Sequence, residues 1–401
     1  MSDGQVSREV PAGGRNFTPL GRRNLLRGTG MLVGASTAGL SMAAAQPSMP
    51  AARSAGGSAP GANRDAASSH NGRLHKRMVG YMLGHEQFTV PTLVQLGGLA
   101  SRAGFDLLAT SDHFQPWQAN EGHAGEAWVT LGALGAQAPR SWMGTTVTCP
   151  TFRYNPAVVA EAFASLSLLY PGRIFLGVGS GEALNERAAT GAWPKWQERW
   201  DRLIEALTII RALWGGQPVS HKGQYYTVEA RLYDPPAQPI PVLTAANGRK
   251  SMRLAGLHGD GLITDPLTWK QHKAEWEGGA REAGKNPADM PVLVEQFVVV
   301  GGEAEARQAA ELWRFTQKAF KTLYNVTDPA EIQRRADAES PLDQVMQGWP
   351  VGTDPGAHIA KIQELFDSGV SIVNVHAGQM DQERVIDFYA NHVLPKVKQP
   401  A

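Results

Sequence analysis

Two short segments carry side chains suited to acid–base chemistry. Residues 111–117 read Ser-Asp-His-Phe-Gln-Pro-Trp, and residues 179–186 read Gly-Ser-Gly-Glu-Ala-Leu-Asn-Glu. Histidine exchanges a proton near neutral pH, so His113 is a candidate general base, and Asp112 is suited to orienting a neighbour. Two other interpretations stay open. The Asp-His pair is a capping pair at a strand end, or Asp112 and His113 bind a metal together with His123.

The glycines at 177, 179 and 181 follow an apolar run and raise the question of a dinucleotide site. The dinucleotide fingerprint requires a third glycine where Glu182 stands, and a carboxylate there would repel a pyrophosphate. We therefore expect these glycines to let the backbone approach a flat ring, with Glu182 directed at that ring. The chain has no Gly-Lys-Ser/Thr loop of the Walker type.

Short apolar runs alternate with amphipathic segments from Met78 onward, and these elements must position the polar residues. The expected strands are Val79–Leu83, Leu107–Thr110, Trp142–Val147, Ile174–Val178, Val242–Ala245, Leu262–Thr264, Val292–Val300 and Ile372–Val375. The clearest expected helices are Pro91–Ala103, Ala127–Gln137, Pro156–Leu169 and Trp196–Leu213. About eight β/α pairs predict an α/β fold of the (β/α)8 TIM-barrel type, with a doubly wound open sheet as the alternative.

Two segments interrupt this alternation, at Gly215–Pro239 and at about Phe315–Gly352. We interpret both as insertions over the carboxyl-terminal face of the barrel. The active site of such a barrel lies at that face, where the strands end. Five expected strand ends therefore point into one pocket and bring together Glu86, His113, Trp117 and Glu182.

The bulk composition excludes several functions. The 401 residues carry a formal net charge of +1, which gives no electrostatic basis for binding nucleic acid. The single cysteine, Cys149, excludes an intrachain disulfide and a cysteine-rich metal site. We predict no metal in the site.

The N-terminal residues are typical of export. Arg22 and Arg23 precede an uncharged run from Gly28 to Ala45 that ends in three alanines. This order of charged, apolar and small residues predicts a signal peptide over residues 1–45, and the paired arginines resemble the twin-arginine type. Residues 46–77, rich in Pro, Gly, Ala and Ser, are expected to be a disordered linker. The barrel is expected over residues 78–401.

Three segments carry a family resemblance: residues 111–117, residues 150–156 (Pro-Thr-Phe-Arg-Tyr-Asn-Pro) and residues 175–186. They resemble the F420-dependent glucose-6-phosphate dehydrogenases, a group within the bacterial-luciferase-like superfamily. The resemblance covers about Met78 to Lys398 and implies an oxidoreductase that uses coenzyme F420 as its hydride partner. It also implies a homodimer.

The resemblance implies a role for each matching residue. His113 would accept the substrate's hydroxyl proton, Trp117 would pack against substrate and cofactor, and Glu182 would protonate the deazaflavin ring. Glu86 would help to hold the substrate. The residues implied for the cofactor are Asp112, Thr146, Val147, Cys149, Gly179, Asn185, Ala245, Ala246 and Asn247. The family also has a cis peptide bond before a residue other than proline, which would fall at Thr146–Val147.

The sequence departs from this family where its members hold a sugar phosphate. Two lysines and an arginine are replaced near Thr268, Leu323 and Gly348, although Lys270 and Lys321 lie close in sequence. A phosphate dianion would lack its charge partners, so we expect glucose 6-phosphate not to be the substrate. These apolar replacements suit a lipid chain, and the export signal together with the resemblance implies hydroxymycolic acid of the cell envelope, which would be oxidised to a ketone.

Other classes of protein remain as alternatives. They are an F420-dependent enzyme with a different substrate, an FMN-dependent monooxygenase of the same superfamily, a non-catalytic cofactor or lipid carrier, and a nicotinamide dehydrogenase. Glu182 disfavours the last of these, as argued above.

Overall fold

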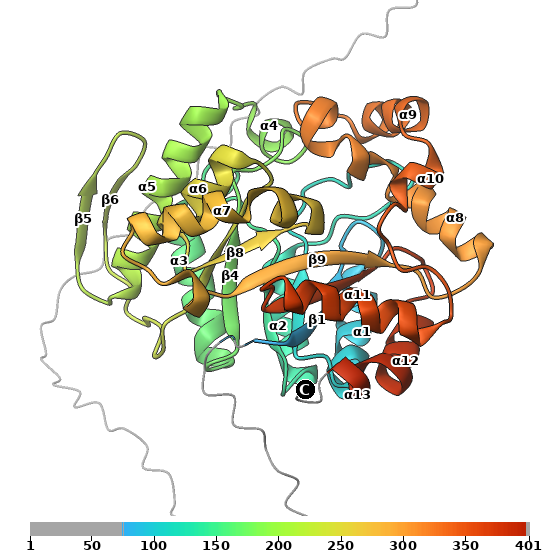
Figure 1. The fold of residues 1–401 in the computed structure, drawn as a ribbon. Coiled ribbons are helices and arrows are strands. Elements are labelled where there is room, and N and C mark those ends of the chain that lie inside the picture. The colour runs from blue at the N-terminus through green and yellow to red at the C-terminus, as the bar shows by residue number, and fades with distance from the viewer. Residues whose placement is uncertain (1–73, 75, 398–401) are drawn as a thin grey trace, which may run out of the picture. The chain divides into compact units, whose positions relative to one another are not determined.

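Eight parallel strands form a closed barrel at the centre of the computed structural model, which describes residues 74 and 76–397 (Figure 1). The strands are β1 (Met78–Leu83), β2 (Leu107–Thr110), β3 (Trp142–Thr145), β4 (Ile174–Val178), β7 (Val242–Ala245), β8 (Gly261–Thr264), β9 (Val292–Val298) and β10 (Ile372–Ala377). Their order around the barrel is β1-β10-β9-β8-β7-β4-β3-β2, and β1 pairs with both β10 and β2 to close it. The predicted (β/α)8 barrel is confirmed, and the open sheet is wrong.

Helices surround the barrel. The α-helices are α1 (Val90–Ala103), α2 (Ala127–Gln137), α3 (Pro156–Leu169), α4 (Glu186–Thr190), α5 (Trp196–Trp214), α6 (Arg249–His258), α7 (Pro266–Glu282), α8 (Glu303–Leu312), α9 (Pro329–Glu339), α10 (Leu342–Val345), α11 (Pro355–Asp367), α12 (Gln382–Phe388) and α13 (Leu394–Val397). Shorter helical turns are η1 (Pro287–Asp289), η2 (Arg314–Gln317), η3 (Ala319–Leu323) and η4 (Tyr389–Val393). None of the described helices is both long and apolar enough to cross a membrane.

One sequence signature starts several of these helices. An Asn or Asp precedes a proline, and its side-chain oxygen accepts a hydrogen bond from the backbone N–H two residues further on. This occurs at the starts of α3, α7, α9 and α11. The side chain satisfies an amide that the helix leaves unpaired, and the proline already has a helical φ.

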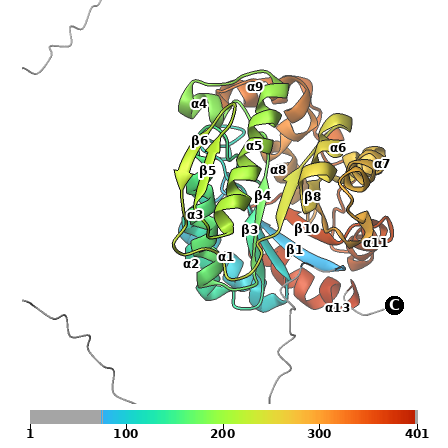
Figure 2. The same ribbon diagram turned by 90° about the vertical axis from the view of Figure 1, so that its left-hand side faces the viewer.

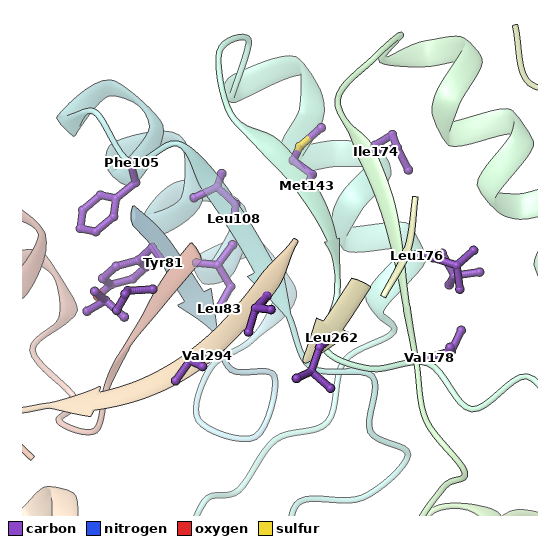
Figure 3. Packing of buried hydrophobic residues seen from close by; sticks show 14 of the residues in the cluster. Tyr81, Leu83, Phe105, Leu108, Met143, Ile174, Leu176, Val178, Leu262 and Val294 are labelled. Carbon is purple, nitrogen blue, oxygen red and sulfur yellow. The ribbon is translucent and has the colours of Figure 1, made fainter. Parts of the chain in front are cut away.

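The strands separate two apolar cores. Met82, Leu107, Trp142 and Phe175 fill the barrel interior. Alternate residues point outward into the layer beneath the helices, because successive strand side chains face opposite ways. Figure 3 shows part of this outer layer, with Tyr81, Leu83, Leu108, Met143, Ile174, Leu176, Val178, Leu262 and Val294 among its labelled side chains.

The two insertions take different forms. The first contains an antiparallel hairpin of β5 (Val219–Lys222) and β6 (Thr227–Ala230) that lies along α5 (Figure 2). The Glu205 carboxylate of α5 accepts hydrogen bonds from the backbone N–H groups of Tyr225 and Tyr226. Next to the turn of this hairpin, the Tyr226 hydroxyl donates to the carbonyl of Thr151 in the loop after β3. The second insertion folds into η2, η3, α9 and α10 and lies at the same end of the barrel as α4, which follows β4 (Figures 1 and 2).

The expected strand Trp142–Val147 is shorter than predicted. β3 ends at Thr145, because the chain turns at a cis peptide bond between Thr146 and Val147. The expected cis bond is therefore confirmed. The predicted signal peptide (1–45) and nearly all of the predicted linker (46–77) lie outside the described residues.

Candidate active site

His113 and Glu86 form the polar centre of the site. They follow β2 and β1, which are neighbours in the barrel, and 3.6 Å separates His113 Nδ1 from Glu86 Oε1. The His113 Nδ1–H faces the carbonyl of Gln115 at 3.3 Å. Glu86 is buried, and its Oε2 accepts a 2.8 Å hydrogen bond from the Ser111 hydroxyl. With Nδ1 directed at two acceptors, His113 leaves Nε2 as the nitrogen that can accept a proton.

Aromatic and aliphatic side chains cover this centre. Trp117 lies with its ring centroid 5.8 Å from that of His113 and stacks on Phe315 at 4.7 Å. Phe320 contacts the Trp117 ring edge-on at 6.1 Å, and Leu323 is fully buried in the same cluster. We call Trp117, Phe315, Phe320 and Leu323 the apolar roof. Three of its four members come from the second insertion, so that insertion supplies most of the apolar side chains around Trp117.

Asn185 connects the two loops that the sequence singled out. Its Oδ1 accepts a hydrogen bond from the backbone N–H of Phe114 at 2.8 Å, and its Nδ2 donates to Glu182 Oε2 at 3.3 Å. Asn185 is buried, whereas Glu182 is partly exposed. The arrangement fixes the loop after β4 against the loop that carries His113, with the Glu182 carboxylate at the rim.

Small residues from three adjacent strands form a close-packed floor. A Cβ added to Gly179 would lie 2.7 Å from Val147 Cγ2 and 3.9 Å from Ala245 Cβ. Val147 and Ala245 also pack on the interior core, and the Thr146 hydroxyl donates to the sulfur of Met82 at 3.4 Å. The structure thus brings together four of the residues implied for the cofactor, at the carboxyl ends of β3, β4 and β7.

Three further residues implied for the cofactor lie around this floor. Cys149 is buried beside Gly181, with its Sγ 3.1 Å from the Thr151 hydroxyl. The carbonyl of Ala246 accepts a hydrogen bond from Thr264. Asn247 is exposed, and its backbone N–H donates to Ser251 at 3.3 Å.

Asp112 is the acceptor at the centre of a buried hydrogen-bond network. One carboxylate oxygen accepts hydrogen bonds from Arg153 at 2.9 Å and from the Tyr154 hydroxyl at 3.1 Å, and the other accepts from Thr148 at 2.6 Å. Arg153 also contacts Glu186, whose Oε2 accepts the Arg153 backbone N–H at 2.9 Å. Asp112 therefore ties the loops after β2 and β3 together, which matches the orienting role considered for it.

Burial dominates the titration of this network. It raises the pKa of Glu186 to about 7, and the nearby Arg153 guanidinium opposes that rise only in part. Burial also holds the pKa of the Cys149 thiol well above its usual value. Glu121, which lies in the loop after β2, has its pKa raised well above normal by burial and by the charge of Glu86.

Sequence reasoning missed a second carboxylate–histidine pair, Glu295 and His376, on β9 and β10. His376 Nδ1 lies 2.7 Å from Glu295 Oε1, and His376 is buried. The rule that selected the other strand ends would also have selected His376, which directly follows the predicted strand Ile372–Val375. Ser111, Arg153 and Glu186 stand inside the recognised motifs, but sequence alone assigned them no role.

The positions that hold a phosphate in the resembling family have no positive charge here. Thr268 is buried and donates its hydroxyl to Asp265, Leu323 belongs to the apolar roof, and Gly348 is exposed with φ of +86°. Lys270 and Lys321 are both exposed. Among residues 74 and 76–397, no group of three His, Cys, Asp or Glu side chains is arranged to hold a metal ion.

Comparison with known proteins agrees with this geometry. The family model described as luciferase-like monooxygenase matches residues 72–371. An F420-dependent hydroxymycolic acid dehydrogenase of Mycobacterium tuberculosis is 46% identical over 325 residues, which cover 80% of this chain and 89% of that protein. An F420-dependent glucose-6-phosphate dehydrogenase of Rhodococcus jostii is 41% identical over 80% of this chain and 98% of its own length.

A solved structure shares both fold and sequence. An F420-dependent secondary alcohol dehydrogenase, in complex with an F420-acetone adduct, superposes with a TM-score of 0.77 at 33% identity, over 81% of this chain and 100% of its own. The chain therefore belongs to the luciferase-like family. Within that family it is similar to F420-dependent dehydrogenases named for hydroxymycolic acid, glucose 6-phosphate and secondary alcohols.

Proposed function

We propose that this chain is an F420-dependent alcohol dehydrogenase that oxidises hydroxymycolic acid to ketomycolic acid in the cell envelope. The observation that carries the proposal is the His113–Glu86 pair beneath the apolar roof. This pair supplies a proton acceptor next to an apolar space, which is what a lipid secondary alcohol requires. Relatives named for F420 and for alcohol, sugar-phosphate or hydroxymycolic acid substrates support the same assignment.

The residues present fit coenzyme F420. Val147, Gly179 and Ala245 form the close-packed floor, where no side chain is larger than valine, and a Cβ at Gly179 would lie 2.7 Å from Val147 Cγ2. Such a surface suits a flat ring system, and Glu182 and Asn185 stand at its rim. When bound, F420 supplies the hydride acceptor, while the protein contributes position and charge.

His113 handles the substrate's hydroxyl proton. Because Nδ1–H faces Gln115 and Glu86, the hydroxyl would donate its proton to Nε2 as the carbinol carbon is oxidised. The cationic ring would then lie beside the buried Glu86 carboxylate, which stabilises the charge. Ser111 holds that carboxylate in place through its 2.8 Å hydrogen bond. Trp117 and Phe315 keep water away from the reacting carbon.

The apolar roof argues against a sugar phosphate. Leu323 lies near a position where the resemblance implies a cation, and a phosphate dianion beside this leucine would be desolvated without compensation. We predict that glucose 6-phosphate is not oxidised. Measurable F420-dependent turnover of glucose 6-phosphate by the purified protein would contradict this expectation.

The proposed function is tested with the purified protein and F420. Wild-type protein should bind F420 at micromolar concentration or below and should bleach its absorbance when a secondary alcohol is added. Long-chain alcohols and hydroxymycolic acid should be used with higher kcat/KM than 2-propanol. Binding of FMN in place of F420 would move the function to the monooxygenase class, and F420 binding without turnover of any alcohol would indicate a carrier.

We further propose export by the twin-arginine translocase and assembly as a homodimer. The paired arginines of the N-terminal segment support the first, and family membership supports the second. The twin-arginine route transports folded proteins, so the enzyme would acquire its cofactor in the cytoplasm before export.

A further inference from the structure

The apolar roof has one exposed member. Trp117, Phe315 and Leu323 are buried, whereas the exposed fraction of Phe320 is 53%. The Phe320 ring nevertheless contacts the buried part of the roof, because it meets the Trp117 ring edge-on at 6.1 Å. A single exposed ring needs no explanation on a protein surface, but this ring begins a larger apolar feature.

Two more aromatic rings continue outward from Phe320. The Tyr324 ring centroid lies 6.2 Å from that of Phe320, and the Trp193 centroid lies 5.5 Å from that of Tyr324. Both outer rings are half-buried. Tyr324 directly follows η3 in the second insertion, and Trp193 stands in the loop between α4 and α5, at the same end of the barrel (Figures 1 and 2). We call Phe320, Tyr324 and Trp193 the aromatic strip.

A buried arginine holds the two outer rings from behind. Arg199, in the first turn of α5, is only 3% exposed. Its guanidinium lies 4.0 Å from the Trp193 ring centroid and 4.9 Å from that of Tyr324. It also donates hydrogen bonds to the Tyr324 hydroxyl at 2.7 Å and to the carbonyl of Pro194 at 2.6 Å. Cation–π contacts are stronger where the cation is desolvated, so these rings are fixed in place before any ligand arrives.

The polar atoms of the strip already have partners. The Tyr324 hydroxyl accepts the hydrogen bond from Arg199, and the Trp193 Nε1–H donates to Asn325 Oδ1 at 2.8 Å. Phe320 has no polar side-chain atom. The aromatic strip therefore offers a ligand mainly ring carbon atoms, which favour hydrocarbon over a sugar or another strongly polar group.

We propose that the alkyl chain of the alcohol leaves the catalytic pair along the aromatic strip, contacting Phe320 first and Trp193 last. The reacting carbon must lie beside His113, whose ring is 5.8 Å from Trp117, and Phe320 contacts Trp117 from the outside. Continuity of apolar side chains thus selects this direction. The inference rests on the alcohol oxidation proposed above and assigns the chain-binding surface of the same site.

The test measures kcat/KM for a series of 2-alkanols, from 2-butanol to 2-decanol, with the full protein and F420. The readout is the factor by which kcat/KM rises for each methylene added. Wild-type protein should show a rise of roughly twofold per methylene, because a chain lying on an exposed surface is covered on about one side only. Phe320→Ser should lower that factor from the first methylenes onward, whereas Trp193→Ser should lower it only for the longest chains.

Two control variants separate chain binding from a general effect on the fold. Phe320→Leu keeps an apolar side chain on the strip and should retain most of the rise with chain length. Tyr233→Ser removes an aromatic ring that is 85% exposed in the first insertion, and it should keep the wild-type series. The order of the two serine variants along the chain is a result that a merely structural role would not produce.

The possible outcomes distinguish this inference from the proposed function. The same rise with chain length in Phe320→Ser and in wild-type protein would overturn the inference and leave alcohol oxidation intact. A change of oligomeric state in Phe320→Ser, measured by sedimentation velocity, would also overturn it, because a second copy of the chain would then cover the strip. No turnover of any 2-alkanol would reject the proposed function itself.

Discussion

At the residue scale, the proposed mechanism makes His113 the proton acceptor and Glu86 the carboxylate that stabilises the resulting charge. A general base contributes about 10²–10⁴-fold to a reaction rate. We expect His113→Ala to lower kcat by that factor while the Kd for F420 changes by about twofold or less, because the floor that fits the cofactor is unaffected. Stopped-flow turnover and fluorescence titration measure the two quantities.

The matched control for that variant is His123→Ala. His123 lies in the same loop, but its side chain is exposed. It should retain wild-type turnover. A His113→Ala protein that turns over normally but binds F420 poorly would reject the role of general base.

Glu186 gives the fold a specific dependence on pH. Its folded-state pKa of about 7 lies above the value of 4.5 for a free side chain, so folding favours the protonated form. Its contribution to stability is complete below about pH 4.5 and is lost as the pH rises through 7. From pH 5 to pH 8 the loss is roughly 3 kcal/mol at most.

Urea unfolding at a series of pH values measures this effect. Glu186→Gln should lose less free energy of unfolding than wild-type protein between pH 5 and pH 8, because its amide does not ionise. The same pH slope in both proteins would show that Glu186 is not the group responsible.

The site residues that could be predicted from sequence are the ones that follow a strand and belong to a long motif. Glu86, His113, Trp117 and Asn185 follow from the barrel rule and the family resemblance, and their contacts join one site. His376 could have been selected as a strand-end residue, but its pairing with Glu295 was not predictable, because the two are 81 residues apart in sequence. Only the β9–β10 register brings such distant residues together, and neither lies in a recognised motif.

At the scale of elements, two glycines of β4 and its following loop have different functions. A Cβ at Gly177 would lie 1.9 Å from the backbone carbonyl of Thr145, which cannot move without disrupting β3. A Cβ at Gly179 would meet only the side chain of Val147, at 2.7 Å. We therefore expect Gly177→Ala to impair folding and Gly179→Ala to leave folding near normal.

The two glycine variants are compared by thermal unfolding and F420 titration. Gly177→Ala should lower the Tm strongly. Gly179→Ala should keep its Tm within a few degrees and weaken F420 binding about tenfold or more, since the methyl group displaces Val147 from the floor. Unchanged F420 affinity in a folded Gly179→Ala protein would show that the cofactor does not use this floor.

Element positions were largely predictable because each barrel strand is a short apolar run bounded by turn residues. The predicted strands Leu107–Thr110, Ile174–Val178 and Val242–Ala245 match β2, β4 and β7. The end of β3 was misplaced because Val147 is apolar and extends the run, whereas the chain turns at its peptide bond with Thr146. The form of the two insertions was not predictable, because neither has a clear hydrophobic period.

At the scale of the whole molecule, we expect the second insertion to influence which substrates can approach His113. It contributes Phe315, Phe320 and Leu323 to the apolar roof, whereas the barrel contributes the acid–base pair and the floor. In this chain the acid–base pair and the floor thus come from the barrel, and most of the apolar roof comes from the second insertion. The cofactor class was predictable because its motifs lie at the ends of the barrel strands. The substrate was not, because it depends on the side chains of the second insertion.

The proposed export by the twin-arginine route is tested on the whole molecule. Replacing Arg22 and Arg23 by lysines should keep the protein in the cytoplasm of a host with a twin-arginine translocase, because that system recognises the paired guanidinium groups. Cell fractionation with immunoblotting measures this. Continued export of the lysine variant would indicate another route, and a host that lacks the translocase provides the control.

The single thiol has a consequence for the protein's chemical stability after the proposed export. Cys149 is enclosed beside the floor, and its raised pKa keeps it protonated, so it is a poor nucleophile while the chain is folded. Electrophiles and oxidants that react with thiols then have no thiol to attack until the barrel opens. The reaction of this thiol with an added reagent accordingly reports opening of the barrel at the floor itself.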